Sequence, residues 1–300
     1  MPRGAQFGIV VIAFFMVACS SPAYAGIPAT TAVTATVPPP PTLTSTPTLT
    51  PTPTQTPTQT PTSTLSPTPA CHDFRGKVAS DEIDSLTLGK AIPFRIYLPP
   101  CYHAQTQSYP VLYLIHGLNM DESAWDELGI DEVADALIAS DDLPPFIIVM
   151  PRAPDDSRFA DSVALELLPF IDSHYRTLPD RDHRAVGGMS RGGGWAVRIG
   201  FQHPEPFGAM GLHSVAVFYA DENKVHRWIA DVPDELAPRI YIDIGESDPL
   251  IDNSARWLDE TLTARGFAHE FHVRPGGHTS GYWAKHLPEY LRWYTGAWQP

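Results

Sequence analysis

The stretch Gly187–Gly194, which reads GGMSRGGG, decides the fold expected for this chain. It overlaps a short apolar segment, Arg184–Met189, that is typical of a buried strand, and it leads into Gly193–Gln202, a helical pattern that ends before a proline. The serine of this stretch, Ser190, lies in a G-x-S-x-G pattern, which carries a nucleophile on a sharp strand-to-helix turn. Glycines suit such a turn because its backbone passes close to its neighbours. A glycine-rich turn that only permits tight packing is the alternative.

Apolar segments alternate with helical patterns on both sides of this turn. We expect strands at Ile92–Leu98, Val111–Ile115, Phe146–Met150, Arg184–Met189, Phe207–Leu212, Arg239–Ile244 and Glu270–Val273. We expect helices at Ile130–Ile138, Ser162–Tyr175, Gly193–Gln202, Asp252–Thr263 and Trp283–Trp293. This alternation predicts an α/β fold whose central sheet is mostly parallel and has helices on both faces. Ligands bind beyond the carboxyl ends of the strands in such sheets.

A serine hydroxyl becomes a useful nucleophile only when a base takes its proton. On this architecture the acid follows the serine in the chain, and the histidine follows the acid. Asp248 lies in the loop after the strand Arg239–Ile244 and is the expected acid, with Glu246 and Asp252 as alternatives.

The expected base is His278, which a Pro-Gly-Gly turn presents after the last strand. His269 and His272 flank or lie within that strand, and His286 lies inside the closing helix, so we expect these three to be structural or solvated. We also assign a structural role to His116.

The tetrahedral intermediate of acyl transfer needs two hydrogen-bond donors for its oxyanion. The candidates are the backbone N–H groups of Arg191, directly after the serine, and of Leu118, in the loop after the strand Val111–Ile115. Four aromatic residues are candidates for a pocket that binds sugar or aromatic acyl groups, with ordinary packing as the alternative. They are Trp125, Tyr219, Tyr282 and Trp283.

Several of these motifs together resemble the esterase D-like "putative esterase" family of α/β-hydrolases. They are Leu112–Gly117 (LYLIHG) with Trp125 downstream, the elbow Gly187–Gly193, and Gly276–His278 followed by Trp283. The family includes feruloyl and acetylxylan esterases, enterochelin esterases, S-formylglutathione hydrolases and mycolyltransferases. The resemblance extends from residue 94 to residue 293.

The resemblance implies an α/β-hydrolase fold and an esterase or acyltransferase activity that uses Ser190, Asp248 and His278. No cofactor and no metal are expected, and Cys/His clusters with zinc-ligand spacing are absent from the sequence. The segment Ser214–Pro238 is too short for a large lid, so we expect an open pocket.

The first 70 residues predict export and a tether. Residues 1–25 have the pattern of a signal peptide, with an A-x-A cleavage site before Gly26. Met16–Cys19 alternatively resembles a lipobox, in which Cys19 would carry a lipid anchor, and an uncleaved anchor is a third option. Residues 26–70 are expected to form a disordered linker rich in proline and threonine. The domain itself is expected at 71–300.

Cysteine usage agrees with the expected extracytoplasmic bacterial location, either secreted or tethered to the cell surface. Cys71 and Cys101 remain as one pair for a disulfide, although two unrelated thiols are the alternative. The chain has 20 basic and 34 acidic residues and a net charge of −14, which argues against a nucleic-acid partner.

We therefore expect a serine esterase that hydrolyses carboxylic esters, acetyl or feruloyl groups on carbohydrate, through an acyl-serine intermediate. An acyltransferase, or a siderophore or lactone esterase, is the alternative on the same three residues. A non-catalytic surface-binding module of the same fold is the alternative from another class.

Overall fold

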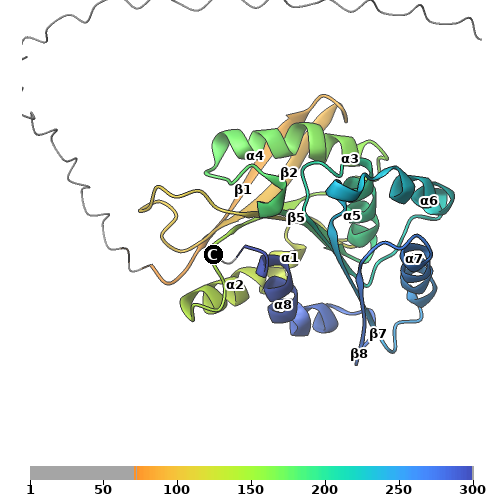
Figure 1. Cartoon of the computed structure of the whole chain (residues 1–300). Helices are drawn as coiled ribbons and strands as arrows, with labels where there is room; N and C mark the ends of the chain where they lie inside the picture. Colours follow the sequence, from red (N-terminus) through yellow and green to blue (C-terminus); the bar gives the residue numbers. More distant parts are fainter. Residues whose placement is uncertain (1–70, 72, 299–300) are drawn as a thin grey trace, which may run out of the picture. The chain divides into compact units, whose positions relative to one another are not determined.

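The computed structural model describes residue 71 and residues 73–298, and eight strands of this part form one sheet (Figure 1). The strands are β1 (Lys77–Ser85), β2 (Lys90–Leu98), β3 (Val111–Ile115), β4 (Ile147–Pro151), β5 (Arg184–Met189), β6 (Ala209–His213), β7 (Arg239–Gly245) and β8 (Glu270–Arg274). Their order across the sheet is β1-β2-β4-β3-β5-β6-β7-β8. The pairs β1–β2 and β2–β4 are antiparallel and all other neighbours are parallel, which confirms the expected α/β-hydrolase class.

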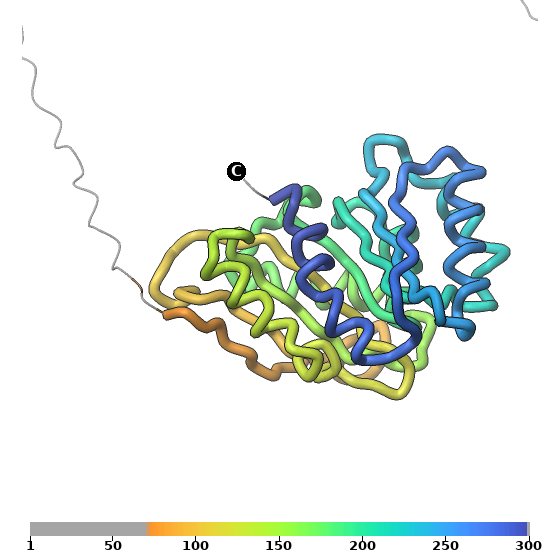
Figure 2. Tube along the Cα trace, turned by 90° about the horizontal axis from the view of Figure 1, so that it is seen from below, coloured from red at the N-terminus to blue at the C-terminus, as the bar shows by residue number. Residues whose placement is uncertain are grey.

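Helices cover both faces of this sheet. The helices are α1 (Ala124–Glu127), α2 (Ile130–Ala139), α3 (Phe159–Ser162), α4 (Leu168–His174), α5 (Arg191–Gln202), α6 (Glu222–Asp231), α7 (Asp252–Ala264) and α8 (Ser280–Thr295). Buried residues of α3 to α7 belong to one apolar core, and those of α1, α2 and α8 belong to a second core on the opposite face. Helices α2 and α8 contact each other on the same face of the sheet, and Figure 2 shows them side by side.

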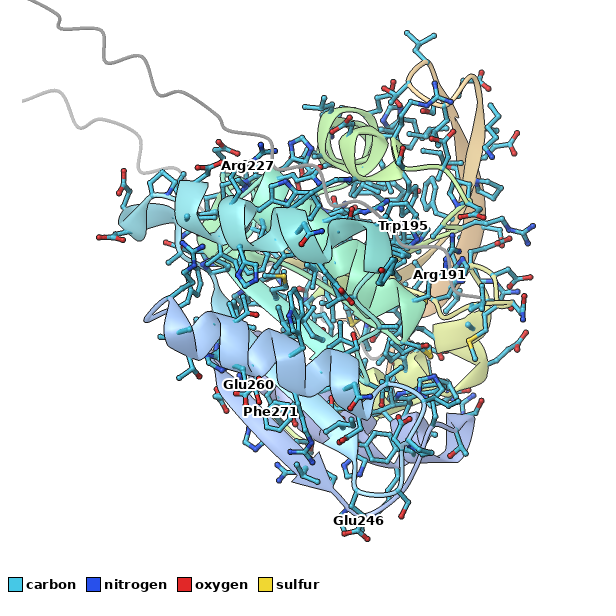
Figure 3. The ribbon with its side chains drawn as sticks, turned by 90° about the vertical axis from the view of Figure 1, so that its right-hand side faces the viewer. Arg191, Trp195, Arg227, Glu246, Glu260 and Phe271 are labelled. Atoms are coloured by element: carbon cyan, nitrogen blue, oxygen red, sulfur yellow. A yellow bond between two sulfur atoms is a disulfide. The ribbon has the colours of Figure 1, made fainter. Side chains whose placement is uncertain are left out.

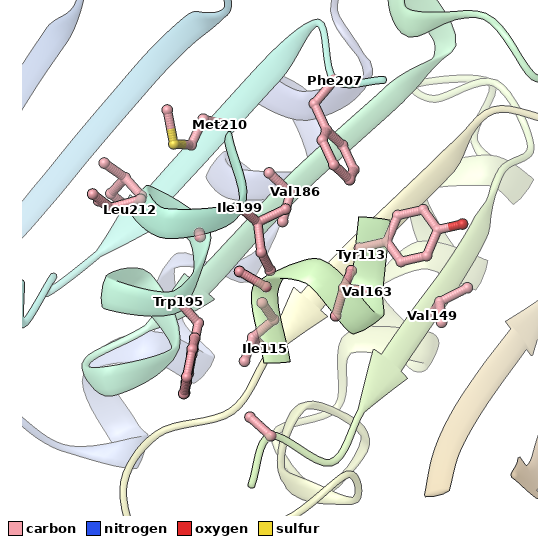
Figure 4. Packing of buried hydrophobic residues seen from close by; sticks show 14 of the residues in the cluster. Tyr113, Ile115, Val149, Val163, Val186, Trp195, Ile199, Phe207, Met210 and Leu212 are labelled. Carbon is pink, nitrogen blue, oxygen red and sulfur yellow. The ribbon is translucent and has the colours of Figure 1, made fainter. Parts of the chain in front are cut away.

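Side-chain alternation along the central strands explains the two cores. Successive residues of a strand point to opposite faces. In β3, Val111, Tyr113 and Ile115 lie in the first core, whereas Leu112 and Leu114 lie in the second. Figure 4 shows part of the first core, where residues of β3, β4, β5 and β6 pack together with residues of α5 and with Val163. Continuous apolar runs therefore identify strands that are buried on both faces.

Apart from shifted ends and unexpected short helical turns such as α1, the structure differs from the expected elements at three places. Strand β1 was not expected, because it is an edge strand whose residues are mostly exposed and polar. The predicted helix Ser162–Tyr175 is instead α3, a π-helical turn at Val163–Leu167, and α4. Helix α6 was missed because it buries only Val225 and Ile229.

A disulfide joins Cys71 to Cys101, as the cysteine count predicted, with the two Cα atoms 5.7 Å apart. It links the chain just before β1 to the turn after β2. The predicted signal peptide (1–25), the lipobox at Cys19 and the linker (26–70) lie outside the described residues. Among the residues that are described, none of the helices combines the length and apolar character that a membrane span requires.

We predict that this disulfide stabilises the folded domain. It closes a loop across a sequence separation of 30 residues, for which chain entropy predicts a loss of about 3–4 kcal/mol when both cysteines are replaced. Denaturant unfolding of a Cys71→Ala/Cys101→Ala variant measures this loss. Reduction of the wild-type protein should give the same loss, and the reductant should leave the variant unchanged. Equal stability of the variant and the oxidised wild type would contradict the prediction.

Candidate active site

Ser190 occupies the single residue between the end of β5 and the start of α5. Its φ of 54° lies in the left-handed region, which costs free energy for a residue with a side chain and is common at functional turns. Its N–H donates to the carbonyl oxygen of His213 over 2.8 Å, and its own carbonyl accepts from the N–H of Ala216 over 3.0 Å. Backbone hydrogen bonds on both sides therefore hold the serine in this conformation.

Glycines on each side of Ser190 allow the turn to fit against β3. A Cβ atom on Gly188 would lie 2.4 Å from the carbonyl carbon of Gly192, and a Cβ on Gly192 would lie 2.1 Å from the carbonyl oxygen of Ile115. Both distances are far inside van der Waals contact and involve backbone atoms, so no side chain fits at either position. The glycine pattern is thus a packing requirement, and it also presents Ser190.

The side chains of Ser190, His278 and Asp248 form one hydrogen-bonded chain. Nε2 of His278 lies 2.9 Å from Oγ of Ser190, and Nδ1 lies 2.8 Å from Oδ2 of Asp248. Asp248 is buried, and the His278 side chain is 17% exposed. Because the carboxylate accepts the Nδ1 proton, the neutral ring leaves Nε2 free to accept the serine proton. The structure thus brings together the three residues predicted from the sequence order.

The two alternative acids lie elsewhere. Glu246 is exposed at the end of β7 and points away from the protein (Figure 3). Asp252 begins α7, where it accepts a hydrogen bond from Arg256 over 2.8 Å.

The other histidines considered have structural partners. Three of them form a hydrogen bond with a carboxylate other than Asp248. These pairs are His269 with Asp259, His272 with Glu270 and His286 with Glu289. Burial lowers the pKa of His116, which keeps its ring neutral. Its Nε2 accepts from the N–H of Ala153 over 2.9 Å, so this ring joins the loops after β3 and β4. This agrees with the structural role expected for His116.

The loops that carry the acid and the base are joined directly. The N–H of Ser247 donates to the carbonyl oxygen of Gly276 over 2.8 Å. Ser247 directly precedes Asp248, and Gly276 lies two residues before His278. Thr279 then caps α8 by accepting from the N–H of Tyr282. The ring of Trp283 meets the His278 ring edge to face, with the centroids 5.0 Å apart. Backbone, cap and ring contacts together limit the movement of the imidazole.

A hollow of about 520 Å³ opens at Ser190 and His278. The loop Gly117–Met120 borders it on one side, and Leu250, Ile251 and Trp283 line it on the other. Leu118 and Leu250 are exposed, at 61% and 76%, although both side chains are apolar. Exposed leucines beside a nucleophile favour an apolar substrate group. The segment 214–238, where no large lid was expected, contributes no lining residue to this hollow.

One of the two predicted oxyanion donors lies at the start of a helix, and the other lies in a loop. Arg191 is the first residue of α5, so its N–H has no acceptor within the helix and the positive end of the helix dipole faces the turn. Leu118 lies in the loop that borders the hollow. The Arg191 side chain pairs with Asp155 over 2.9 Å and lies beside Trp195 on the same helix (Figure 3). The roles of both N–H groups stay predictions.

The aromatic candidates divide between the pocket and the packing alternative. Only Trp283 of the four candidates lines the hollow. Trp125 is buried and donates to the carbonyl of Ile115, Tyr282 is buried and donates to Asp243, and Tyr219 is 87% exposed. Trp125 and Tyr282 pack in the second core, as buried aromatic residues commonly do. The apolar pair Leu250–Ile251, which begins two residues after the acid, is the signal that was missed.

The described residues hold no group of three or more histidine, cysteine, aspartate or glutamate side chains arranged to bind a metal ion.

Proteins of known sequence extend these observations. The chain is 32% identical over 209 residues to an endo-1,4-beta-xylanase/feruloyl esterase of Xylanibacter ruminicola, which covers 64% of this chain and 27% of that protein. It is 28% identical over 246 residues to esterase Rv1288 of Mycobacterium tuberculosis, which covers 61% of this chain and 51% of that protein. The chain therefore spans between about a quarter and a half of these relatives.

Solved structures with the same fold include a ferulic acid esterase, with a TM-score of 0.67 and 27% identity, which matches 75% of this chain and 100% of that one. A ferulic acid esterase of Anaeromyces mucronatus, solved with ferulic acid, shares the fold at a TM-score of 0.63 and 18% identity, over 80% of this chain and 96% of that one.

The family model described as "Putative esterase" matches residues 85–294, a range that includes the elbow, the acid loop and the histidine loop. Because this match covers well over half of the chain, the protein belongs to the "Putative esterase" family.

Proposed function

We propose that this protein is a serine carboxylic-ester hydrolase that works through an acyl-Ser190 intermediate. The observation that carries the proposal is the hydrogen-bonded chain from Ser190 through His278 to Asp248, with Ser190 at the head of a hollow. Membership of the esterase family supports the same reaction class.

The geometry supports a two-step acyl transfer. Nε2 of His278 takes the proton of Ser190 as Oγ bonds to the ester carbonyl carbon, and the same nitrogen then gives that proton to the departing alcohol oxygen as the C–O bond breaks. Water repeats the sequence: His278 takes a water proton, the hydroxide oxygen bonds to the acyl carbon, and Ser190 leaves with the proton returned to it. Asp248 orients the ring and stabilises the imidazolium formed in each step.

The oxyanion formed in each step carries a full negative charge. We assign its stabilisation to the N–H groups of Arg191 and Leu118, each contributing about 3 kcal/mol in comparable sites. The position of Arg191 at the start of α5 supports this assignment, because the helix dipole favours an anion there.

For the substrate we propose an ester of an aromatic acid, of the feruloyl type, on a carbohydrate alcohol. The apolar side chains of Leu118, Leu250 and Trp283 beside Ser190 support a planar apolar acyl group. The relatives whose names include feruloyl or ferulic acid esterase support the same class. Acetyl esters are the second candidate.

We also propose that residues 71–300 form an exported catalytic domain. The protein is secreted if the signal peptide is cleaved before Gly26, and it is tethered through residues 26–70 if Cys19 carries a lipid anchor. The disulfide between Cys71 and Cys101 supports an oxidising compartment.

Ser190→Ala should lower kcat/KM for p-nitrophenyl acetate by roughly 10⁴-fold, because the nucleophile is lost while the pocket remains. Ser140→Ala, at an exposed serine at the end of α2, serves as the control and should retain the wild-type rate. Equal turnover by Ser190→Ala and the wild type would end the esterase proposal in favour of a binding module.

Asp248→Asn should lower kcat by about 10³–10⁴-fold, because the amide NH₂ can donate to Nδ1 and so favour the tautomer that carries its proton on Nε2. The negative charge that stabilises the imidazolium is also lost. Glu246→Gln and Asp252→Asn should change kcat by less than about 2-fold, since neither contacts His278. Steady-state kinetics of the three variants tests the assignment, which fails if either alternative shows the larger loss.

Leu250→Ala should lower kcat/KM for methyl ferulate about 10-fold more than for an acetyl ester, because the larger acyl group loses an apolar contact worth about 1–2 kcal/mol. Leu165→Ala removes another exposed leucine, which does not line the hollow, and should leave both rates unchanged. A parallel loss for both esters would contradict the placement of the acyl group.

A further inference from the structure

A histidine–aspartate pair without solvent exposure lies among the residues of the second core. His213 ends β6 and Asp243 lies in β7, and both are fully buried. Nδ1 of His213 lies 2.7 Å from Oδ1 of Asp243, and its Nε2 lies 2.9 Å from the hydroxyl of Tyr294. Oδ2 of Asp243 accepts from Tyr282 over 2.6 Å and from Tyr290 over 2.8 Å. Asp243, His213 and the three tyrosines together form a buried network that we call the Asp243 hub.

The hydrogen-bond pattern fixes the protons of the Asp243 hub. Burial raises the pKa of all three tyrosines, so each hydroxyl keeps its proton and donates it. Tyr294 has His213 as its hydrogen-bond partner in the described structure, so Nε2 accepts that proton. A neutral ring that accepts at Nε2 must donate at Nδ1, and Asp243 is therefore a carboxylate that accepts three hydrogen bonds.

The Asp243 hub connects to each element that carries a residue of the proposed triad. The carbonyl of His213 accepts the N–H of Ser190. Asp243 lies near the end of β7, five residues before Asp248 in the loop that follows this strand. The carbonyl of Asp243 accepts the N–H of Ser214 over 2.8 Å. Tyr282 lies in the first turn of α8, four residues after His278.

Tyr282 is the member of the hub closest in sequence to the histidine loop. Its ring packs against Gly276, where a Cβ atom would lie 2.6 Å from Cδ2 of the ring. Gly276 in turn accepts the N–H of Ser247 in the acid loop. Tyr290 bonds the same carboxylate oxygen from two turns further along α8. The two tyrosines therefore share one acceptor and differ in their distance along the chain from His278.

We propose that Asp243 is a positioning residue that sets the mutual placement of Ser190, Asp248 and His278, with Tyr282 as its link to the histidine loop. This inference rests on the proposed esterase function. Three charge-assisted hydrogen bonds to one buried carboxylate restrain the ends of β6, β7 and the start of α8 together. Small displacements of reacting groups reduce the rate of acyl transfer strongly, so such a restraint acts on catalysis and not only on stability.

The experiment compares three Tyr→Phe variants in the full-length chain, because replacing Asp243 itself risks loss of the fold. Tyr282→Phe and Tyr290→Phe each remove one hydrogen bond to Asp243. Tyr97→Phe is the matched control, since it removes a hydrogen bond of 2.7 Å from a buried tyrosine to Asp135, remote in sequence from the triad. Thermal unfolding, kcat and KM for p-nitrophenyl acetate are measured for each.

We expect falls in Tm for all three variants, because each loses one Tyr–Asp hydrogen bond. Tyr282→Phe should lower kcat about 10-fold with KM changed by less than about 2-fold, Tyr290→Phe should lower kcat by about 2–3-fold, and Tyr97→Phe should keep the wild-type kcat. A kcat loss for Tyr282→Phe no greater than that of Tyr97→Phe would overturn the positioning role. A Ser190→Ala variant as active as the wild type would instead overturn the esterase function, so the two failures are distinguishable.

Discussion

The close approach of the turn at Ser190 to the end of β3 is the constraint on which the rest of the site depends. Gly192 passes so near the carbonyl of Ile115 that no side chain fits between them. This contact holds the start of α5 against β3 and leaves Ser190 in a left-handed conformation. The hydroxyl consequently projects beyond the carboxyl ends of the parallel strands, where the loops after β3, β7 and β8 converge.

Each of those loops contributes a different chemical group. The loop after β3 borders the hollow and carries Leu118, the loop after β7 carries Asp248, and the loop after β8 carries His278. The acid and histidine loops are joined by a backbone hydrogen bond between Ser247 and Gly276. The proposed triad is thus assembled from residues up to 88 positions apart in the chain.

Sequence patterns predicted the parts of the protein that depend on local signals. Buried strands such as β3 read as continuous apolar runs, and the glycine-flanked Ser190 stands out because the backbone geometry excludes other residues there. Edge strand β1 gave no such signal because its exposed residues are polar. The Asp243 hub was also missed: its members come from β6, β7 and α8, and only the folded structure brings them together. The exposed Leu250 was not recognised because a single apolar loop residue resembles many others.

The hydroxyl of Tyr294 rests over two glycines on neighbouring strands. A Cβ atom on Gly187 or on Gly211 would lie within 2 Å of this oxygen. Alanine at position 187 or 211 is therefore compatible only with a residue smaller than tyrosine at position 294. Conversely, tyrosine fits at position 294 only where positions 187 and 211 are both glycine. These three positions should consequently covary among homologous sequences. Homologues that keep both glycines and the tyrosine are expected to pack α8 against the sheet in the same way.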